Sequence, residues 1–194
     1  MNSKRNISTY ILCGGLSSRM HQEKGLVLFK EKPFMAHVIA AVTPITNDIY
    51  LVTKNLDYEV FGYPLVSDIY ENKGPVGGIY TALNHSKTQY NLILSCDIPN
   101  INTSVLQTYL LNQSFEQEEV IYLRDEISEY PLIGLYSKAV ESKFHDAIKR
   151  EDLKLLSLTK SLINKAITVE FEDRYALKNI NTKEDLTSLT FLGK

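Results

Sequence analysis

The residues best suited to chemistry form one loop near the start of the sequence. An apolar run, Tyr10 to Cys13, stops at the adjacent glycines Gly14 and Gly15, and the polar stretch that follows contains Arg19 and Lys24. Glycines let the backbone turn sharply and let a bulky group approach its N–H donors. Such donors, together with fixed positive charge after a strand, suit a polyphosphate. The glycine pair alone would indicate an ordinary turn, but the loop as a whole indicates phosphate binding.

This loop matches neither of two common phosphate-binding motifs. The dinucleotide fingerprint needs a third glycine that opens a helix, and none follows at that spacing. The P-loop ends in Gly-Lys-Ser/Thr, whereas here Lys24 precedes Gly25 and Leu26, so no hydroxyl is placed to hold magnesium. A different kind of phosphate loop is therefore expected.

Two carboxylates and a second glycine-rich segment are expected at the same place. Asp68 follows a short strand at 64–67, Gly74 to Gly78 opens a helix, and Asp97 directly follows the most hydrophobic strand, at 91–96. Loops at the carboxyl ends of strands form the binding crevice of an open α/β sheet. Carboxylates beside a polyphosphate need a divalent cation between them, and Mg²⁺ binds one or two carboxylates together with phosphate oxygens. Asp97 is thus either a Mg²⁺ ligand or, equally on position alone, a cap of the following turn.

The elements that must position these residues alternate between strands and helices. Strands are expected at 7–13, 48–53, 64–67, 91–96, 120–123, 130–136 and 166–171. Helices are expected at 33–43, 76–85, 103–112 with Asn102 or Thr103 as cap, 139–149, 153–163, and from Thr182 to about 189 with Asp185 completing a capping box. This alternation predicts a Rossmann-like three-layer α/β sandwich with a mostly parallel sheet. The break in alternation after residue 120 predicts one antiparallel strand there.

The composition excludes several classes of function. The 194 residues suit a single domain, and the formal net charge of −2 provides no basic field for a nucleic acid or an anionic membrane. The cysteines Cys13 and Cys96 both end apolar runs, which is typical of buried thiols in a reducing compartment. The first residues lack the apolar core of a signal peptide, and no apolar run is long enough to span a membrane. A cytoplasmic protein with no nucleic-acid or membrane partner is expected.

Several motifs resemble those of nucleotidyltransferases that activate sugar phosphates, and among these they are most similar to the molybdenum cofactor guanylyltransferases. In chain order they are L-x-G-G-x-S-x-R-M-x-x-x-K from Leu12 to Lys24, Asp68, Gly74-Pro75-Val76-Gly77-Gly78, Asp97-Ile98-Pro99, Tyr130-Pro131-Leu132-Ile133 and Asn179-Ile180-Asn181-Thr182. Each motif alone is weak, but together and in the family's order they are specific. His21 and Glu23 stand where the family commonly has Gly and Asp, and Lys183 replaces its usual proline.

The resemblance implies a glycosyltransferase-A-like fold and a Mg²⁺-dependent reaction. GMP would pass from GTP to the terminal phosphate of molybdopterin, with release of pyrophosphate. Lys24, Arg19 and Asp97 would be catalytic, and Asp97 would hold the metal. The nucleotide-binding set would be Leu12, Cys13, Gly14, Gly15, Lys24, Asp68, Gly77 and Asp97, and the acceptor-binding set Tyr130, Pro131 and Asn181. Transient contact with proteins that deliver or receive the cofactor is also implied.

Two other functions stay open at this stage. A related enzyme would use CTP on the same cofactor, or a nucleoside triphosphate on a sugar or polyol phosphate. A non-enzymatic protein of the same fold would sense the nucleotide or deliver the cofactor, since fold does not imply function. Retention of Arg19, Lys24 and Asp97 together favours an enzyme, because a sensor has no need of a metal-binding carboxylate.

Overall fold

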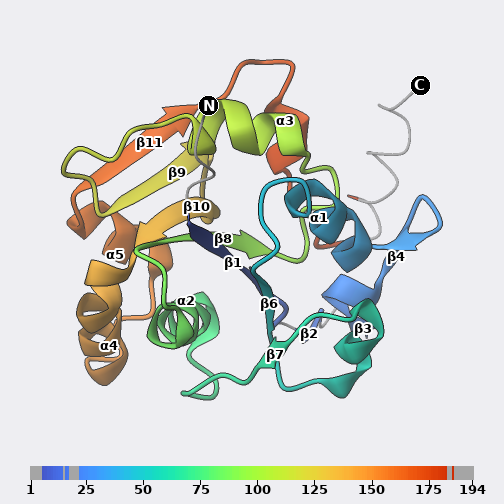
Figure 1. The fold of residues 1–194 in the computed structure, drawn as a ribbon, viewed down its shortest axis with the longest axis horizontal. Helices are drawn as coiled ribbons and strands as arrows, with labels where there is room; N and C mark the ends of the chain where they lie inside the picture. The colour runs from blue at the N-terminus through green and yellow to red at the C-terminus, as the bar shows by residue number, and fades with distance from the viewer. Residues whose placement is uncertain (1–5, 15, 18–21, 183–184, 186–194) are drawn as a thin grey trace.

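A seven-stranded sheet runs through the computed structural model, which describes residues 6–14, 16–17, 22–182 and 185 (Figure 1). The strands, in order across the sheet, are β11 (Asn164–Thr168), β9 (Val120–Arg124), β10 (Glu129–Ser137), β8 (Tyr90–Ser95), β1 (Ile7–Leu12), β6 (Ile49–Val52) and β7 (Leu65–Val66). Only β10 runs antiparallel to its neighbours in this sheet. The prediction of a mostly parallel sheet with one antiparallel strand is confirmed. Two small ladders join β2 (Leu16–Ser17) to β3 (Gln22–Glu23) and β4 (Leu28–Phe29) to β5 (Lys32–Pro33).

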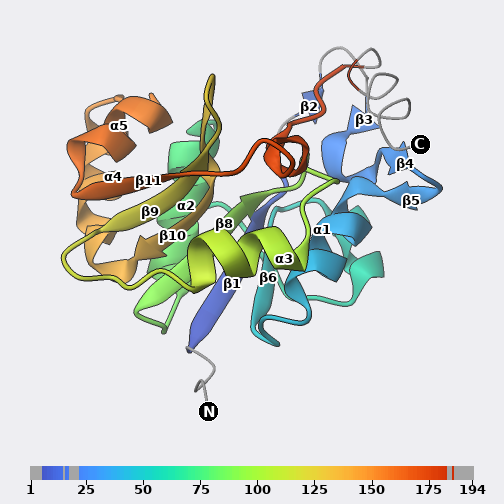
Figure 2. The ribbon, with the colours of Figure 1, turned by 90° about the horizontal axis from the view of Figure 1, so that it is seen from above.

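Helices cover both faces of the sheet, which gives three layers (Figures 1 and 2). One face carries α1 (Phe34–Val42) and α3 (Thr103–Leu106), which continues into a π-helical turn, Gln107–Leu111. The other face carries α2 (Gly74–His85), α4 (Glu141–Lys149) and α5 (Leu155–Ser161). The short 3₁₀ helices are η1 (Lys24–Leu26), η2 (Leu56–Phe61), η4 (Lys138–Val140) and η5 (Arg174–Leu177). Within the described ranges, no helix is both long and apolar enough to cross a membrane.

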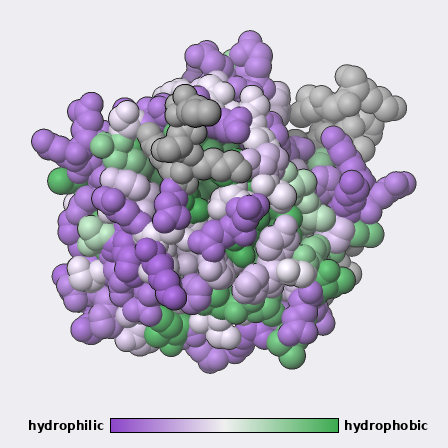
Figure 3. All heavy atoms as spheres, viewed as in Figure 1, coloured by the Kyte–Doolittle hydropathy of each residue, from purple (hydrophilic) through white to green (hydrophobic). Residues whose placement is uncertain are grey.

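The side chains of the central strands alternate between two cores. Ile11 packs in the core under α1 and α3, whereas its neighbours Tyr10 and Leu12 pack in the core under α2 and α4. β8 lies in the middle of the sheet with Leu92 and Ile93 fully buried on opposite faces, as its unbroken apolar run predicted. On the face seen in Figure 3, hydrophobic residues are scattered between hydrophilic ones. The apolar side chains are thus mostly used to hold the layers together.

The register brings the carboxyl ends of four parallel strands to one edge. Leu12 pairs with both Val52 and Ser95, and Val52 pairs with Val66. β10 is antiparallel, so its first residues, not its last, reach this edge beside the end of β8. The segments that follow β1, β6, β7 and β8 therefore meet there, together with the start of β10.

Several elements differ from the sequence-based expectation, and three of them lie beside the site or the C-terminal segment. α2 begins at Gly74, so the glycine-rich segment forms its first turns and not a preceding loop; Pro75, with its fixed φ, suits that position. β11 begins at Asn164 and ends at Thr168, because its five residues pair with the five of β9. The 3₁₀ helix η5 has no apolar periodicity and was not expected.

The expected last helix lies largely outside the described residues, but its capping box is visible. The N–H of Asp185 donates to the hydroxyl of Thr182 at 3.0 Å, and the N–H of Thr182 donates to the Asp185 carboxylate at 2.9 Å. This reciprocal pair is the one that the sequence predicts.

Asn102, and not Thr103, caps α3. The side-chain oxygen of Asn102 accepts from the N–H of Val105 at 2.9 Å, while the hydroxyl of Thr103 donates to the carbonyl of Ala41. Replacement of Asn102 by Ala should lower the free energy of unfolding by about 1 kcal/mol, measured by urea denaturation. Asn102→Asp keeps an acceptor and should remain near wild type. An equal loss in both variants would contradict the capping role.

Candidate active site

Asp97 is held in place by several contacts at the carboxyl edge. Its side chain is 9% exposed, and one carboxylate oxygen lies 3.0 Å from the ammonium nitrogen of Lys24. The other oxygen accepts from the side-chain amide of Asn179 at 2.8 Å, and its backbone carbonyl accepts from the N–H of Ile180 at 2.8 Å. A nearly buried carboxylate needs such partners. Asp97 therefore joins three segments that are far apart in the sequence.

Lys24 bridges the carboxylate and the C-terminal segment. Its ammonium donates to the side-chain oxygen of Asn181 at 2.6 Å as well as to Asp97, and 21% of its side chain stays exposed. The next residue, Gly25, is buried against Tyr58, and a Cβ at Gly25 would lie 2.6 Å from the Tyr58 hydroxyl oxygen. Only glycine lets the chain pass this close to Tyr58. This close approach fixes the backbone that carries the ammonium.

The backbone at Gly14 is open to a ligand. The N–H of Cys13 donates to Val52 and the N–H of Cys96 donates to Leu12, each at 3.1 Å, so the parallel ladder continues one residue beyond β1. The chain then leaves the sheet at Gly14, which is exposed and would have nothing within 4 Å of an added Cβ. A bulky anionic group could therefore approach the backbone here.

The two cysteines beside this backbone are not suited to nucleophilic chemistry. Burial raises the pKa of the Cys13 thiol well above its usual value. Burial, with the neighbouring charge of Asp97, does the same for the pKa of Cys96. Buried neutral thiols are inert, because the thiolate is the reactive form.

Asp68 lies in the loop between β7 and α2. Burial raises its pKa, and the charge of Lys54 opposes this while Glu71 adds to it. The N–H of Ile69 donates to the hydroxyl of Thr81 at 3.0 Å, which ties the loop to α2. In the described part of the chain, no hydrogen bond or ion pair joins Asp68 to Asp97. The two carboxylates thus lie on the same edge without direct contact.

The glycines of α2 allow close packing at its first turns. A Cβ at Gly77 would lie 2.7 Å from the Cβ of Lys73, and one at Gly78 would lie 3.1 Å from the Leu12 side chain. Gly78, the last residue of the expected glycine-rich motif, therefore sets how near α2 comes to the end of β1.

α4 and the turn that follows it hold this loop in place. Lys73 forms an ion pair with Glu151 at 2.5 Å, and the hydroxyl of Tyr70 shares a hydrogen bond with His145 at 2.9 Å. The partners are 78 and 75 residues apart, so no local pattern could reveal them.

The expected acceptor residues fall into two places. Asn181 contacts Lys24. Tyr130 instead donates to Asp125 at 2.9 Å and accepts from Lys178 at 2.8 Å, and the carbonyl of Pro131 accepts from the hydroxyl of Tyr136. Lys178 immediately precedes Asn179, the partner of Asp97, so the Tyr130 cluster borders the main site.

Asp125 is a buried carboxylate that no pattern in the sequence singles out. Burial alone would raise its pKa. The ammonium of Lys178 at 3.0 Å, the N–H groups of Ser128 and Ile127, and the Tyr130 hydroxyl outweigh this and hold the pKa of Asp125 well below its usual range. The charge of Asp125 thus fastens Lys178 to the hairpin between β9 and β10.

Two of the expected phosphate-binding residues, Gly15 and Arg19, lie outside the described residues. Across the described ranges, no three His, Cys, Asp or Glu side chains gather closely enough to hold a metal ion. A single carboxylate such as Asp97 suits Mg²⁺ that takes its other ligands from phosphates and water. The described histidines each pair elsewhere: His37 with Phe29, His85 with Tyr10 and His145 with Tyr70. The arrangement can thus neutralise and position anionic groups, and does not present a histidine as a base.

The sheet topology and the site at its carboxyl edge define an α/β nucleotidyltransferase. A crystal structure of molybdopterin-guanine dinucleotide biosynthesis protein A from Archaeoglobus fulgidus shares the fold, with a TM-score of 0.81 over 95% of this chain and 97% of that chain, at 19% identity. Residues 9–166 match the family described as MobA-like NTP transferase domain, and the chain belongs to that family. The resemblance inferred from the motifs is confirmed.

Two relatives that match this chain over nearly their whole length have the same name. The chain is 44% identical to a probable molybdenum cofactor guanylyltransferase of Flavobacterium johnsoniae, with 94% of this chain and 96% of the relative covered. It is 32% identical to the protein of the same name from Aquifex aeolicus, with 91% and 87% covered.

Asp125 should make the stability of the protein depend on pH. Its pKa is lower in the folded chain than in the unfolded chain, where it is about 3.9, so the ionised form stabilises the fold at neutral pH. This contribution is lost as the pH falls through about 4 toward the folded-state pKa. Asp125→Asn should lower the free energy of unfolding by about 1–3 kcal/mol at neutral pH, measured by urea denaturation. The difference from wild type should shrink between about pH 5 and about pH 3.

The matched control is Glu126→Gln, which removes the charge of the exposed neighbouring carboxylate. It should change stability little at any of these pH values. A loss in Asp125→Asn that stays constant as the pH falls would contradict the assigned role of the charge.

Proposed function

We propose that this protein transfers GMP from GTP to the terminal phosphate of molybdopterin, which forms the guanine dinucleotide cofactor and releases pyrophosphate. The observation that carries the proposal is the Lys24–Asp97 pair, 3.0 Å apart, beside the open backbone at Gly14. The names of the relatives from Flavobacterium johnsoniae and Aquifex aeolicus support the choice of GTP and of the molybdenum cofactor.

The reaction needs positioning and charge neutralisation more than proton transfer. The acceptor phosphate is ionised at neutral pH, so an oxygen of it can attack the α-phosphorus of GTP without a general base. A new phosphorus–oxygen bond forms, the bond to the β-phosphate oxygen breaks, and pyrophosphate leaves with the electron pair. Lys24, whose side chain is partly exposed, would exchange Asn181 for a donor phosphate and neutralise charge there. Arg19 is proposed to act with it on the same phosphates.

Asp97 is the residue proposed to hold Mg²⁺. Asn179 and Lys24 fix its two carboxylate oxygens, and each oxygen keeps a further lone pair for a ligand. When bound, Mg²⁺ would neutralise charge on the phosphates and help to orient them. The chain itself contributes the fixed position of the carboxylate.

The remaining proposed contacts divide between the two substrates. The backbone of Leu12, Cys13, Gly14 and Gly15, with Asp68 and Gly77, would contact the nucleotide. Tyr130, Pro131 and Asn181 would lie toward the acceptor. We further propose that residues 1–194 act as one domain, in the cytoplasm, where the free cysteines would stay reduced, and that transient contacts with other proteins bring and remove the cofactor.

A substrate panel tests the proposed reaction. Pyrophosphate release would be measured with GTP and with CTP, with Mg²⁺ or EDTA, and with or without molybdopterin. We expect release only with GTP, Mg²⁺ and molybdopterin together. Release with CTP would overturn the base assignment, and release with a sugar phosphate in place of molybdopterin would overturn the acceptor. Tight GTP binding without any release would indicate a binding protein.

Lys24→Ala should lower kcat by about a hundred- to a thousand-fold, since an electrostatic donor to the reacting phosphates is lost. The matched control is Lys32→Ala, which removes an exposed cation from the nearby β5. Lys32→Ala should keep wild-type turnover and a wild-type unfolding curve. Lys24→Ala leaves Asp97 without its ion-pair partner and should lower the free energy of unfolding, so its turnover is measured at a temperature where its circular dichroism spectrum is that of the folded protein. Turnover of Lys24→Ala within a few-fold of wild type would remove Lys24 from the mechanism.

A further inference from the structure

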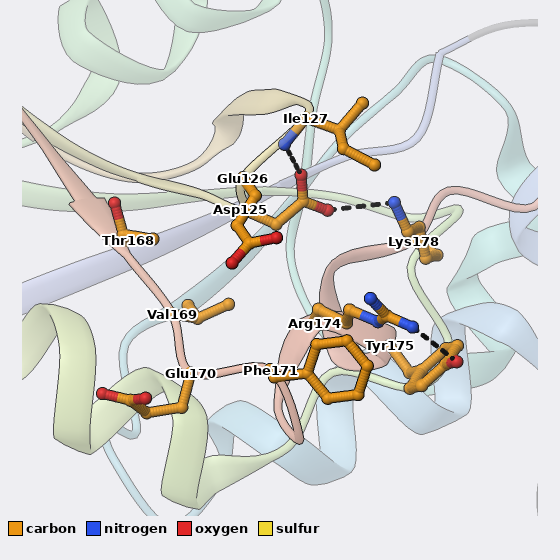
Figure 4. A pocket seen from close by; sticks show the side chains of 10 residues that line it. All are labelled: Asp125, Glu126, Ile127, Thr168, Val169, Glu170, Phe171, Arg174, Tyr175 and Lys178. Atoms are coloured by element: carbon orange, nitrogen blue, oxygen red, sulfur yellow. Dashed lines mark hydrogen bonds and ion pairs between the residues drawn. The ribbon is translucent and has the colours of Figure 1, made fainter.

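A cavity of about 490 Å³ borders the candidate site and has no part in the account so far (Figure 4). It opens between the tip of the β9–β10 hairpin and the segment that follows β11. The hairpin contributes Asp125, Glu126 and Ile127, and the segment contributes Phe171, Arg174 and Lys178.

One wall of the cavity is formed by the side chain of Arg174 stacked on the ring of Phe171. The guanidinium of Arg174 lies 3.6 Å from the ring centroid of Phe171 and donates to the hydroxyl of Tyr175 at 3.0 Å. Phe171 is nevertheless 58% exposed. Within the described residues, no carboxylate lies within ion-pair distance of Arg174. The wall thus offers a planar cation and an aromatic ring, both of which stack on flat unsaturated groups.

The opposite side of the cavity is formed by the apolar side chain of Ile127, which lies in the turn between β9 and β10. Ile127 is 88% exposed, and Figure 4 shows it on the far side of the opening from Phe171 and Arg174. Its position is fixed because one oxygen of Asp125 accepts from the N–H groups of Ile127 and Ser128, at 2.8 and 2.6 Å. The cavity therefore has two opposed surfaces that suit the two faces of a flat ring.

Acceptors for hydrogen bonds line the remaining sides of the cavity. Glu126 and Glu170 are exposed, and within the described ranges their carboxylates make no ion pair. Ionised carboxylates accept hydrogen bonds and cannot donate them. A ring with amino and ring N–H groups along its edge matches this chemistry.

Adjacent residues of the chain link the cavity to the Lys24–Asp97 pair. Lys178 lines the cavity and donates to Asp125, and the next residue, Asn179, donates to Asp97. A ligand with a phosphate at one end and a flat ring at the other could therefore occupy both places at once.

We propose that this cavity binds the pterin ring of the acceptor while the acceptor's phosphate lies at Lys24 and Asp97. The ring packs between the Phe171–Arg174 stack and Ile127, and Glu126 accepts hydrogen bonds from its amino and N–H groups. This inference rests on the proposed function, because the acceptor named there is the compound that carries both groups.

The test uses Phe171→Ala and Arg174→Gln, with Phe171→Tyr as the matched control that keeps a ring. Binding of 6-hydroxymethylpterin would be followed by quenching of its fluorescence, and the KM values for molybdopterin and GTP would be measured in parallel. We expect pterin binding to weaken, and the KM for molybdopterin to rise, by about tenfold or more in the first two variants. Phe171→Tyr should resemble wild type, and the KM for GTP should stay constant in all three.

Pterin binding that is absent from wild type, or equal in wild type and both disruptive variants, would overturn the inference. Wild-type unfolding curves and unchanged GTP affinity in the variants exclude general misfolding as the cause. The two proposals fail separately. Absence of GMP transfer by the wild type would overturn the proposed function, while ring-dependent pterin binding would still support the cavity as a pterin site.

Discussion

The arrangement of the site depends on how the nearly buried carboxylate of Asp97 is satisfied. An ionised group out of water costs several kcal/mol unless it is paired and hydrogen-bonded. Lys24 and Asn179 supply those partners, and the N–H of Ile180 binds the backbone carbonyl of the same residue. Because the Asp97 carboxylate needs these partners, the N-terminal loop and the C-terminal segment are both held at the end of the central strand. A polyphosphate that enters would meet an ammonium already held in place, so little reorganisation would be needed.

The antiparallel strand β10 places the β9–β10 hairpin at the same edge of the sheet as the carboxyl ends of the parallel strands. Because β10 begins where β8 ends, the β9–β10 hairpin projects its tip, with Asp125 and Tyr130, beside the parallel strands' carboxyl ends. Figure 2 shows the segment after β11 crossing from that hairpin toward β2. The ends of β1 and β7 with α2 form the half proposed to take the nucleotide. The hairpin and the crossing segment form the half proposed to take the acceptor.

The sequence predicted the parts of this structure that follow from local patterns. The apolar run that became β8 indicated a central strand, and a carboxylate directly after it had to lie at the functional edge. The pairs Lys178–Asp125 and Lys73–Glu151 could not be predicted, because they join residues 53 and 78 positions apart and charged residues usually face solvent. The predicted start of α2 at residue 76 was wrong. The glycines before it suggested a loop, whereas Pro75 favours the first turn of a helix and α2 begins at Gly74. The cavity is formed by segments before β10 and after β11, so only the fold brings its walls together.

The most direct test of the account is the fate of each phosphate of GTP. Wild-type protein would be incubated with Mg²⁺, molybdopterin and GTP labelled with ³²P at either the α or the γ position, and the products would be separated. The account predicts that the α label appears in a product that contains molybdopterin and that the γ label appears only in pyrophosphate. Transfer of the γ label to the acceptor, or an α label that stays in free guanine nucleotide, would contradict nucleotidyl transfer by this site.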